Sequence, residues 1–231
     1  MQNLVNAEKI ARGARLGKIG TLAGLGFLVA GLVISLVMKE SPLLWLSFVC
    51  LLAGILVSSI GTANLNRWVR QPRADQALAQ GLKGFDDRYR LYNYLLPAPH
   101  VLLSPVGLYV LTALGTEGVI RYEGTRFRRD FSLGRLFRFM TDEQLGRPFA
   151  EADAQVQALQ KFLDTHGLGQ EVQLQNILVF YHPRVQLVVS DPPRPIVDPK
   201  SLKKAIRRQP GEKLSASVYQ KLQELFDGAA G

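Results

Sequence analysis

The hydrophobic pattern divides the chain into two uninterrupted apolar runs and a longer region of short periodic segments. Residues 19–38 form a run of 20 and residues 43–63 a run of 21, and neither contains a charged side chain. At about 1.5 Å per residue, each run forms a helix that can cross a hydrocarbon core of roughly 30 Å. A cleaved signal peptide is the alternative, but its apolar core is normally about 7 to 15 residues, followed by a small-residue cleavage site. The pattern therefore predicts a transmembrane helical hairpin over residues 19–63.

Basic residues are concentrated beside these two runs. Of the net charge of +9, residues 1–18 supply +3, from four Lys or Arg against one Glu, and residues 64–73 supply +3 from three Arg. Because Lys and Arg beside a span are retained on the cytoplasmic side, both termini and the C-terminal domain are predicted to be cytoplasmic, with the hairpin integral to the cell inner membrane. The turn at residues 39–42, whose charge is zero, is then expected on the opposite side.

The charge and hydropathy patterns together predict the domain boundaries. They are a basic cytoplasmic N-terminus over residues 1–18, the hairpin over 19–63, a basic juxtamembrane linker over 64–72, and a cytoplasmic α/β domain over 73–231. The last region has its own apolar strands and amphipathic helices, so we expect it to fold without the hairpin.

A few residues in and beside the spans carry further expectations. Trp45 and Trp68 lie near span ends, where an aromatic ring suits the membrane interface. Gly20 and Gly24 have the spacing that allows two helices to approach closely, although ordinary glycine content in a span explains them equally well. Cys50 is the only cysteine, so no disulfide framework can form, and a packing role is expected.

Beyond residue 73, helical and strand patterns alternate. Residues 74–92 give a broken helical pattern, with one helix or two, and Pro105 and Gly107 suit the turn of a β-hairpin. Asp198 is placed to cap a helix that begins at Pro199. The predicted strands are 100–104, 108–112, 118–122, 125–128, 176–181 and 185–189, and the further helices are 151–167, 199–206 and 215–226. The alternation predicts an α/β domain with a mixed sheet.

The order of these segments resembles the nuclease-related domain (NERD) family. The resemblance covers roughly residues 72–209 and rests on "LLPAPHVLLSPVGLYVLTAL", "GRPFAEADAQVQALQKFL" and "NILVFYHPRVQLVV". It implies a restriction-endonuclease-like fold, in which a metal-binding aspartate begins one strand and an E-x-K motif lies on the next. His100 and Gly107 match the family pattern. Pro99 stands at the position of the aspartate, Thr112 at that of the glutamate, and Leu114 at that of the lysine.

These departures remove the groups that such a nuclease needs. Carboxylates hold the divalent ion, the ion activates water, and the lysine positions that water. Thr112 and Leu114 are two residues apart on a strand and therefore project from one face, but they offer a neutral hydroxyl and an alkyl group. Pro99 has no side-chain oxygen. The resemblance therefore implies a degenerate site with no catalytic residue, no bound metal and no cofactor.

A relocated metal site is the alternative interpretation. It would need nearby carboxylates, and each of them is also explained as a solvated surface charge. The three histidines are far apart and lack the i, i+4 pairing typical of zinc ligands, although His100 is expected to pack or cap at its strand. The acids are Asp75, Asp86, Asp87, Glu117 and Asp130, and the other histidines are His166 and His182.

A second candidate site is an arginine-rich segment interleaved with aromatic residues. Its arginines are Arg121, Arg126, Arg128, Arg129, Arg135 and Arg138. Such a segment can contact a protein partner, anionic lipid or, less expected here, nucleic acid. It can also be a half-buried hairpin with a charged outer face.

Two functions from different classes remain open. One is a membrane-anchored, non-catalytic interaction or scaffold module with a protein partner, such as an accessory subunit of a membrane complex. The other is a membrane-tethered, metal-dependent nuclease with a rewired site.

Overall fold

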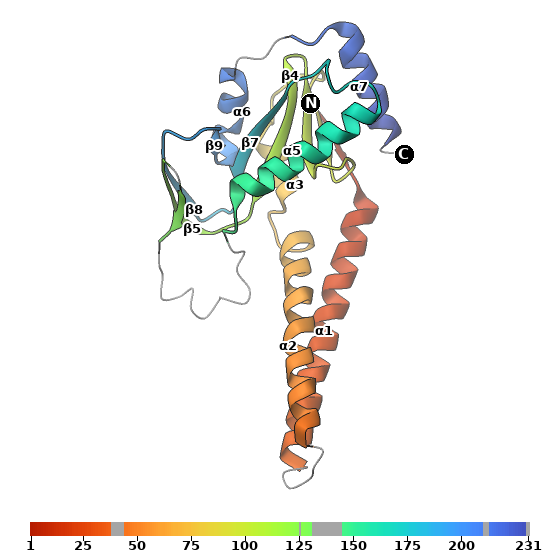
Figure 1. The fold of residues 1–231 in the computed structure, drawn as a ribbon, viewed down its shortest axis with the longest axis vertical. Helices are drawn as coiled ribbons and strands as arrows, with labels where there is room; N and C mark the ends of the chain where they lie inside the picture. The colour runs from red at the N-terminus through yellow and green to blue at the C-terminus, as the bar shows by residue number, and fades with distance from the viewer. Residues whose placement is uncertain (38–43, 125, 131–144, 210–212, 230–231) are drawn as a thin grey trace. The chain divides into compact units, whose positions relative to one another are not determined.

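The structure is a computed structural model that describes residues 1–37, 44–124, 126–130, 145–209 and 213–229. The described residues form two compact units, a helical hairpin over Ala7–Arg73 and an α/β unit that combines Met1–Asn6 with the residues from Ala74 onward (Figure 1). The predicted turn at residues 39–42 and the candidate residues Arg135 and Arg138 lie outside the described residues.

The hairpin consists of α1 (Ala7–Val37) and α2 (Leu44–Trp68), which pack along their length. The positions buried between them are small and recur every seventh residue, the period of a left-handed helix pair. They are Gly17, Gly24 and Gly31 in α1, and Ser47, Gly54 and Gly61 in α2. A Cβ added at Gly20 would lie 3.1 Å from Gly61 Cα, so the two backbones approach closely here.

Both helices are long and apolar enough to cross a membrane, and only 11% and 17% of their most apolar stretches are buried. Trp68 does not lie at an open interface as the sequence predicts. It is 8% exposed, and a Cβ at Gly13 would lie 2.5 Å from its ring. Only a glycine at position 13 leaves room for this ring, and the indole therefore packs between the two helices. Trp45, by contrast, is 59% exposed.

The α/β unit is built on a six-stranded sheet with the order β1-β2-β3-β4-β7-β9. The pairs β2·β3 and β3·β4 are antiparallel, whereas β1·β2, β4·β7 and β7·β9 are parallel, which confirms the predicted mixed sheet. The strands are β1 (Gln2–Val5), β2 (Arg90–Asn93), β3 (His100–Ser104), β4 (Gly107–Leu114), β7 (Leu174–Phe180) and β9 (Ile196–Val197).

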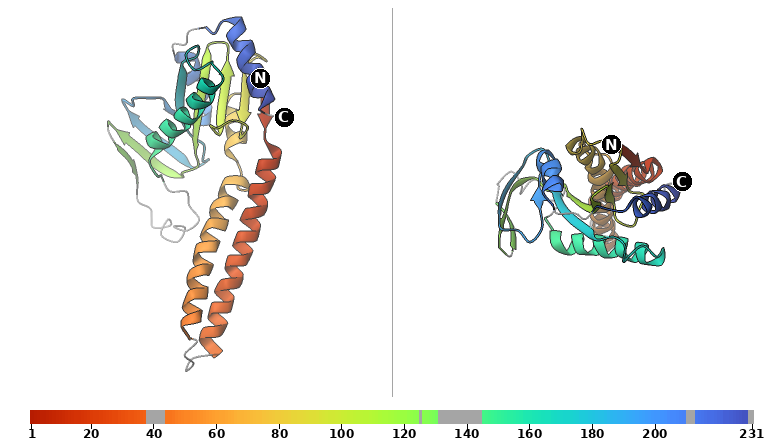
Figure 2. Two further views of the ribbon diagram at one scale, coloured as in Figure 1. Left: turned by 45° about the vertical axis from the view of Figure 1, so that its right-hand side comes forward. Right: turned by 90° about the horizontal axis from the view of Figure 1, so that it is seen from above.

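Helices cover both faces of this sheet. One face packs against α5 (Pro148–Thr165) and α7 (Ala216–Gly228), and the other against α3 (Ala74–Gly81) and α6 (Pro199–Arg208) (Figure 2). Strand β4 shows how the sequence separates the two cores: Leu108 and Val110 lie in the first, whereas Tyr109 and Leu111 lie in the second. Successive side chains on a strand point to opposite faces, so β4 is apolar throughout.

A separate three-stranded sheet has the order β6-β5-β8, with β5 (Gly118–Glu123), β6 (Arg126–Arg129) and β8 (Val185–Ser190). The parallel pair β4·β7 leaves the large sheet at its carboxyl end and continues as the parallel pair β5·β8. The predicted strands are therefore present, but they are divided between two sheets instead of the expected one.

Several local predictions are confirmed. The hairpin β3–β4 turns at Pro105, and Gly107 has the positive φ of 140° that favours glycine. Asp198 caps α6 by accepting from Ser201 N, with Pro199 in the first turn. The helical prediction for residues 74–92 is correct only as far as Gly81. A strand follows at Arg90–Asn93, because Leu91 and Tyr92 alternate between the two cores.

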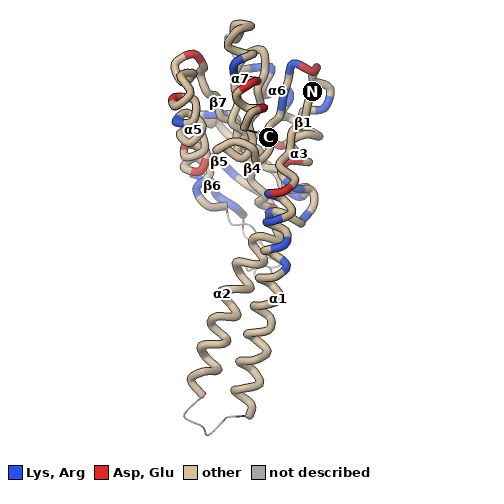
Figure 3. The backbone as a smooth tube through the Cα atoms, turned by 90° about the vertical axis from the view of Figure 1, so that its right-hand side faces the viewer, with Lys and Arg blue, Asp and Glu red and all other residues tan. Residues whose placement is uncertain are grey.

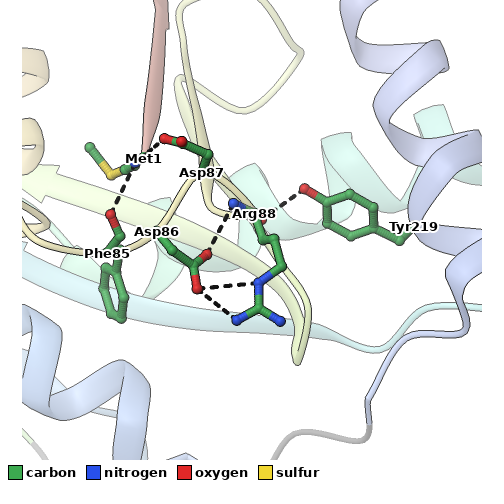
Figure 4. A network of polar contacts seen from close by, with 6 residues as sticks. All are labelled: Met1, Phe85, Asp86, Asp87, Arg88 and Tyr219. Carbon is green, nitrogen blue, oxygen red and sulfur yellow. Dashed lines mark hydrogen bonds and ion pairs between the residues drawn. The ribbon is translucent and has the colours of Figure 1, made fainter.

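The N-terminal strand β1 was not predicted. It pairs with β2 along its whole length, so a segment that precedes the hairpin forms the edge of the sheet (Figure 4 shows its start). The Met1 amine donates to Phe85 O at 3.0 Å and to the Asp87 carboxylate at 3.1 Å. Beside them, the Tyr219 hydroxyl donates to Arg88 O at 2.7 Å, which ties α7 to the same loop.

A buried phenol in this unit yields a first prediction. Tyr109 is 0% exposed, and its hydroxyl has no hydrogen-bond partner among the described residues. Because such a group costs about 1–3 kcal/mol, Tyr109→Phe should raise the free energy of unfolding by about 1 kcal/mol. Burial also raises the pKa of Tyr109, because the buried phenol resists ionisation. The wild-type protein therefore keeps its full stability below the unfolded pKa of about 10 and loses stability as the pH rises above that value, where the unfolded chain releases the phenol proton. The advantage of Tyr109→Phe should therefore grow in alkaline solution.

Thermal melts of the detergent-solubilised chain at pH 8 and in alkaline buffer measure both effects. Tyr92→Phe is the matched control, because the Tyr92 hydroxyl donates to Asp227 at 2.9 Å, and its loss should cost about 1 kcal/mol. A clear drop in stability for Tyr109→Phe would contradict the prediction, since it would mean that this hydroxyl has a partner.

Candidate functional site

Thr112 and Leu114 on β4 both face α5. Thr112 is fully buried, its hydroxyl donates to Gln155 Oε1 at 3.0 Å, and Asn176 Nδ2 donates to the same hydroxyl at 3.0 Å. Gln155 also donates to Glu151 at 3.2 Å. The threonine hydroxyl is thus used as both donor and acceptor by neutral amides, so it is already committed to holding α5 and β7 against β4.

Leu114 lies on the same face, as the spacing predicts, but in an apolar environment. It is 7% exposed and belongs to the core cluster that contains Tyr122, Leu178 and Phe180. An ammonium group here would be removed from water without a carboxylate in the cluster, at a cost of several kcal/mol. Leu114 is therefore a core residue, in surroundings that do not suit a lysine.

Pro99 directly precedes β3, and its carbonyl accepts from Tyr94 N at 2.6 Å. The neighbouring His100 is 4% exposed, its Nδ1 lies 2.7 Å from Asn93 Oδ1, and its ring packs against Tyr94. Asn93 Nδ2 in turn donates to Asn3 Oδ1 at 2.7 Å. Because Asn93 Oδ1 can only accept, Nδ1 carries the proton, and the expectation that His100 packs at the strand start is confirmed.

The carboxylates that the sequence offers for a relocated metal site are dispersed over the unit. Asp75 is buried in the first turn of α3. Asp86 lies 2.6 Å from Arg88, whose hydrogen bonds lower the pKa of Asp86. Asp130 pairs with Arg121 at 3.1 Å. Within the described ranges, no group of three His, Cys, Asp or Glu side chains is arranged to hold a metal ion.

Glu117 takes part in a structural cluster where the chain passes between the two sheets. Its carboxylate accepts from Arg184 at 2.5 Å and lies 3.6 Å from His182 Nε2. Arg184 N donates to His182 Nδ1 at 3.2 Å. Both sides of the cluster belong to the short connections β4–β5 and β7–β8, so these charges hold the two crossings together.

The third histidine is at the end of α5. His166 Nδ1 lies 2.8 Å from Phe162 O, and its ring packs against the Phe162 ring. In the described part of the chain, His100, His166 and His182 therefore lie in three separate environments.

The arginine-rich segment forms a sheet with two different faces. Arg126 and Arg128 are exposed, and Arg121 lies opposite Arg128 in the register of β5 and β6. The interleaved aromatic rings point the other way: Tyr122 and Phe127 pack against each other with ring centroids 4.9 Å apart and join the core below. Of the sequence interpretations, the half-buried hairpin with a charged outer face describes this arrangement. The outer face still presents cations, but no described aromatic ring of the segment accompanies them.

No pattern in the sequence singles out Gln155 and Asn176. Each is one of several polar residues in its segment, and their convergence on Thr112 depends on how α5 and β7 pack against β4. A polar residue on the buried face of a predicted element is the one signal that could have indicated them.

Comparison with protein-family models, with curated proteins and with solved structures gave no match.

Proposed function

We propose that the chain is a membrane-anchored, non-catalytic protein whose α/β unit, a degenerate NERD-like domain of the restriction-endonuclease-like class, serves as a cytoplasmic interaction module. In this proposal the hairpin spans the cell inner membrane and the α/β unit binds a protein partner, as an accessory subunit of a membrane complex would.

Membrane insertion is supported by where the apolar side chains of the hairpin lie. Both helices expose large apolar residues along their length, among them Leu22, Phe27, Phe48 and Leu52. Water would make this exposure costly, whereas lipid chains solvate it.

Strand β1 bears on the side of the membrane at which the two outer ends of the hairpin lie. It precedes α1 yet pairs with β2, which follows α2, so both outer ends of a spanning hairpin must lie on one side of the membrane. The flanking basic residues favour the cytoplasmic side.

The observation that carries the non-catalytic assignment is the environment of Thr112 and Leu114. A divalent ion needs several oxygen ligands, of which carboxylates are the strongest, and a route for water. Thr112 is bonded to neutral amides, and Leu114 is enclosed by apolar side chains. At this point β4 offers an ion only the neutral hydroxyl of Thr112, the adjoining side chains bonded to that hydroxyl are neutral amides, and no lysine stands at position 114 to orient a water.

A cleavage assay tests this proposal. Purified full-length protein, incubated with supercoiled plasmid or single-stranded RNA and either Mg²⁺ or Mn²⁺, should give no metal-dependent cutting above a buffer control. The matched variant is Glu117→Ala, which removes the carboxylate nearest in sequence to Leu114. Robust cutting by the wild type that disappears in this variant would refute the proposal and establish a rewired nuclease.

A further inference from the structure

Helix α6 has two faces of opposite character. Leu202 and Ile206, one helical turn apart, are 0% and 1% exposed and anchor the helix on the core. The rest of its ten residues include no Asp or Glu. Its cations, here called the α6 basic surface, are Lys200, Lys203, Lys204, Arg207 and Arg208 (Lys and Arg are blue in Figure 3).

Several arginines of the unit have a carboxylate partner, and the α6 basic surface differs from them. Arg90 pairs with Asp227 at 2.5 Å, Arg184 with Glu117, and Arg194 with Asp153. In the described part of the chain, no carboxylate lies within 4.0 Å of a cation of α6; the acids of the adjoining loop are paired with Arg88 and the Met1 amine. The helix therefore presents a concentrated positive field that the chain itself does not balance.

Two of these cations are fixed by the loop that follows α3. Lys203 Nζ donates to Lys83 O at 3.3 Å and lies 5.2 Å from the centre of the Phe85 ring, and the Arg207 guanidinium lies 5.6 Å from the same ring. Such contacts limit the freedom of long side chains and so reduce the entropy lost when a ligand binds. Lys200, Lys204 and Arg208 are exposed.

We infer that the α6 basic surface binds an acidic segment of a protein partner. The helix is about 15 Å long, which matches about five residues of extended chain or about ten of a helix. A partner that carries several carboxylates over that length would face every cation of the surface at once. This inference rests on the proposed role as an interaction module and names the chemical character of the partner.

The surroundings of α6 favour a protein over lipid or nucleic acid. Lys203 and Arg207 contact Phe85, whose carbonyl accepts from the Met1 amine, so α6 lies beside the amino end of β1. The other, carboxyl end of β1 continues into α1, so α6 lies at the end of β1 opposite to the one from which the chain enters the hairpin. Single-stranded nucleic acid needs rings for base stacking, but Phe85 is 8% exposed and is covered by the stacked Tyr89 ring, 4.1 Å away.

The test uses the full chain in nanodiscs of neutral phosphatidylcholine, with fluorescein-labelled octaglutamate as the probe and fluorescence anisotropy as the readout. The triple variant Lys200→Gln, Lys204→Gln, Arg208→Gln should weaken binding about tenfold, because each exposed charge pair contributes modestly. The matched control, Arg147→Gln, Lys161→Gln, Lys221→Gln, removes the same charge from exposed positions outside both candidate surfaces and should change binding less than twofold. Lys204→Glu is a single substitution that should weaken binding about fivefold if the triple variant does not fold.

Several outcomes would overturn the inference. Equal weakening by both triple variants would mean that only net charge matters, and absent binding at low salt would mean that no acidic peptide is recognised. Tighter, α6-dependent binding of an oligothymidylate would point to nucleic acid. In a Cys50→Ser background, Lys204→Cys should react with maleimide equally fast in neutral and phosphatidylglycerol discs; strong protection in the anionic discs would make lipid the ligand. None of these results bears on the cleavage assay, so the two proposals fail separately.

Discussion

A protein that begins at Ala74 and lacks the first 73 residues should unfold at a much lower temperature than the complete α/β unit, or should aggregate. It loses β1, whose Met1 and Leu4 side chains pack against the two cores and whose backbone completes the edge of the sheet. With about 1.5–3 kcal/mol for each fully buried apolar side chain, and less for the partial burial of Met1 and Leu4, these two side chains contribute about 2–3 kcal/mol, a substantial part of a typical domain's stability. The bare edge of β2 would also invite pairing between chains.

The matched protein restores the strand without the membrane helices. Residues 1–6 joined to Ala74 by a flexible Gly/Ser linker should be soluble and show one cooperative thermal transition by circular dichroism. Within it, Leu4→Ser should lower the melting temperature clearly, whereas Gln2→Ser, at an exposed position of the same strand, should not. Equal melting of the proteins with and without residues 1–6 would show that β1 is dispensable, as the sequence alone suggests.

Substitution of Gly61 by Leu should separate α1 from α2. A Cβ at Gly61 would lie 2.7 Å from the Gly20 carbonyl carbon and closer still to Thr21 N, and backbone atoms cannot move aside as a flexible side chain can. Overpacking of this kind costs about 1–3 kcal/mol in ordinary cores and more where backbones touch. We therefore expect loss of the native helix contact, measured as a red shift of Trp68 emission in a Trp45→Phe background, because Trp68 is buried in that contact.

Gly26→Leu is the control for this experiment. It lies in α1 like Gly20, but nothing comes within 4 Å of a Cβ built there, so the added side chain should extend from the hairpin without effect on Trp68. A similar red shift in both variants would show that the hairpin tolerates neither change and that the close contact at Gly61 is not the cause.

The sequence predictions are correct where a structure depends on neighbouring residues and fail where it depends on residues far apart in the sequence. The apolar runs, the β3–β4 turn and the Asp198 cap depend on neighbouring residues, and the structure has all of them. The strand at Arg90–Asn93 was assigned to a helix because its four residues are stabilised by β1 and β3 rather than by their own pattern. Strand β1 is equally short, and its partner is more than 80 residues away in sequence.

The candidate site also has a part that local spacing predicts and a part that depends on distant residues. Residues 112 and 114 could be placed on one face of a strand from spacing alone, and the structure has both facing α5. Their partners could not be predicted, because Gln155 and Asn176 come from elements whose packing is decided by the whole core. The two faces of the arginine segment were undecided for a similar reason: only the contact of Tyr122 and Phe127 with the small core shows which side is outward.

The position of β1 constrains the order of events during biosynthesis. The strand is synthesised before the hairpin, but it can pair only after residues 90–93 have emerged from the ribosomal tunnel, and by then both apolar helices have emerged as well. Strand β1 therefore stays unpaired until both helices of the hairpin have been synthesised. Under the proposed membrane insertion, a chain in which only one helix inserts would leave β1 on the opposite side of the membrane from β2. On that proposal, the sheet can be completed only in chains in which both helices have inserted.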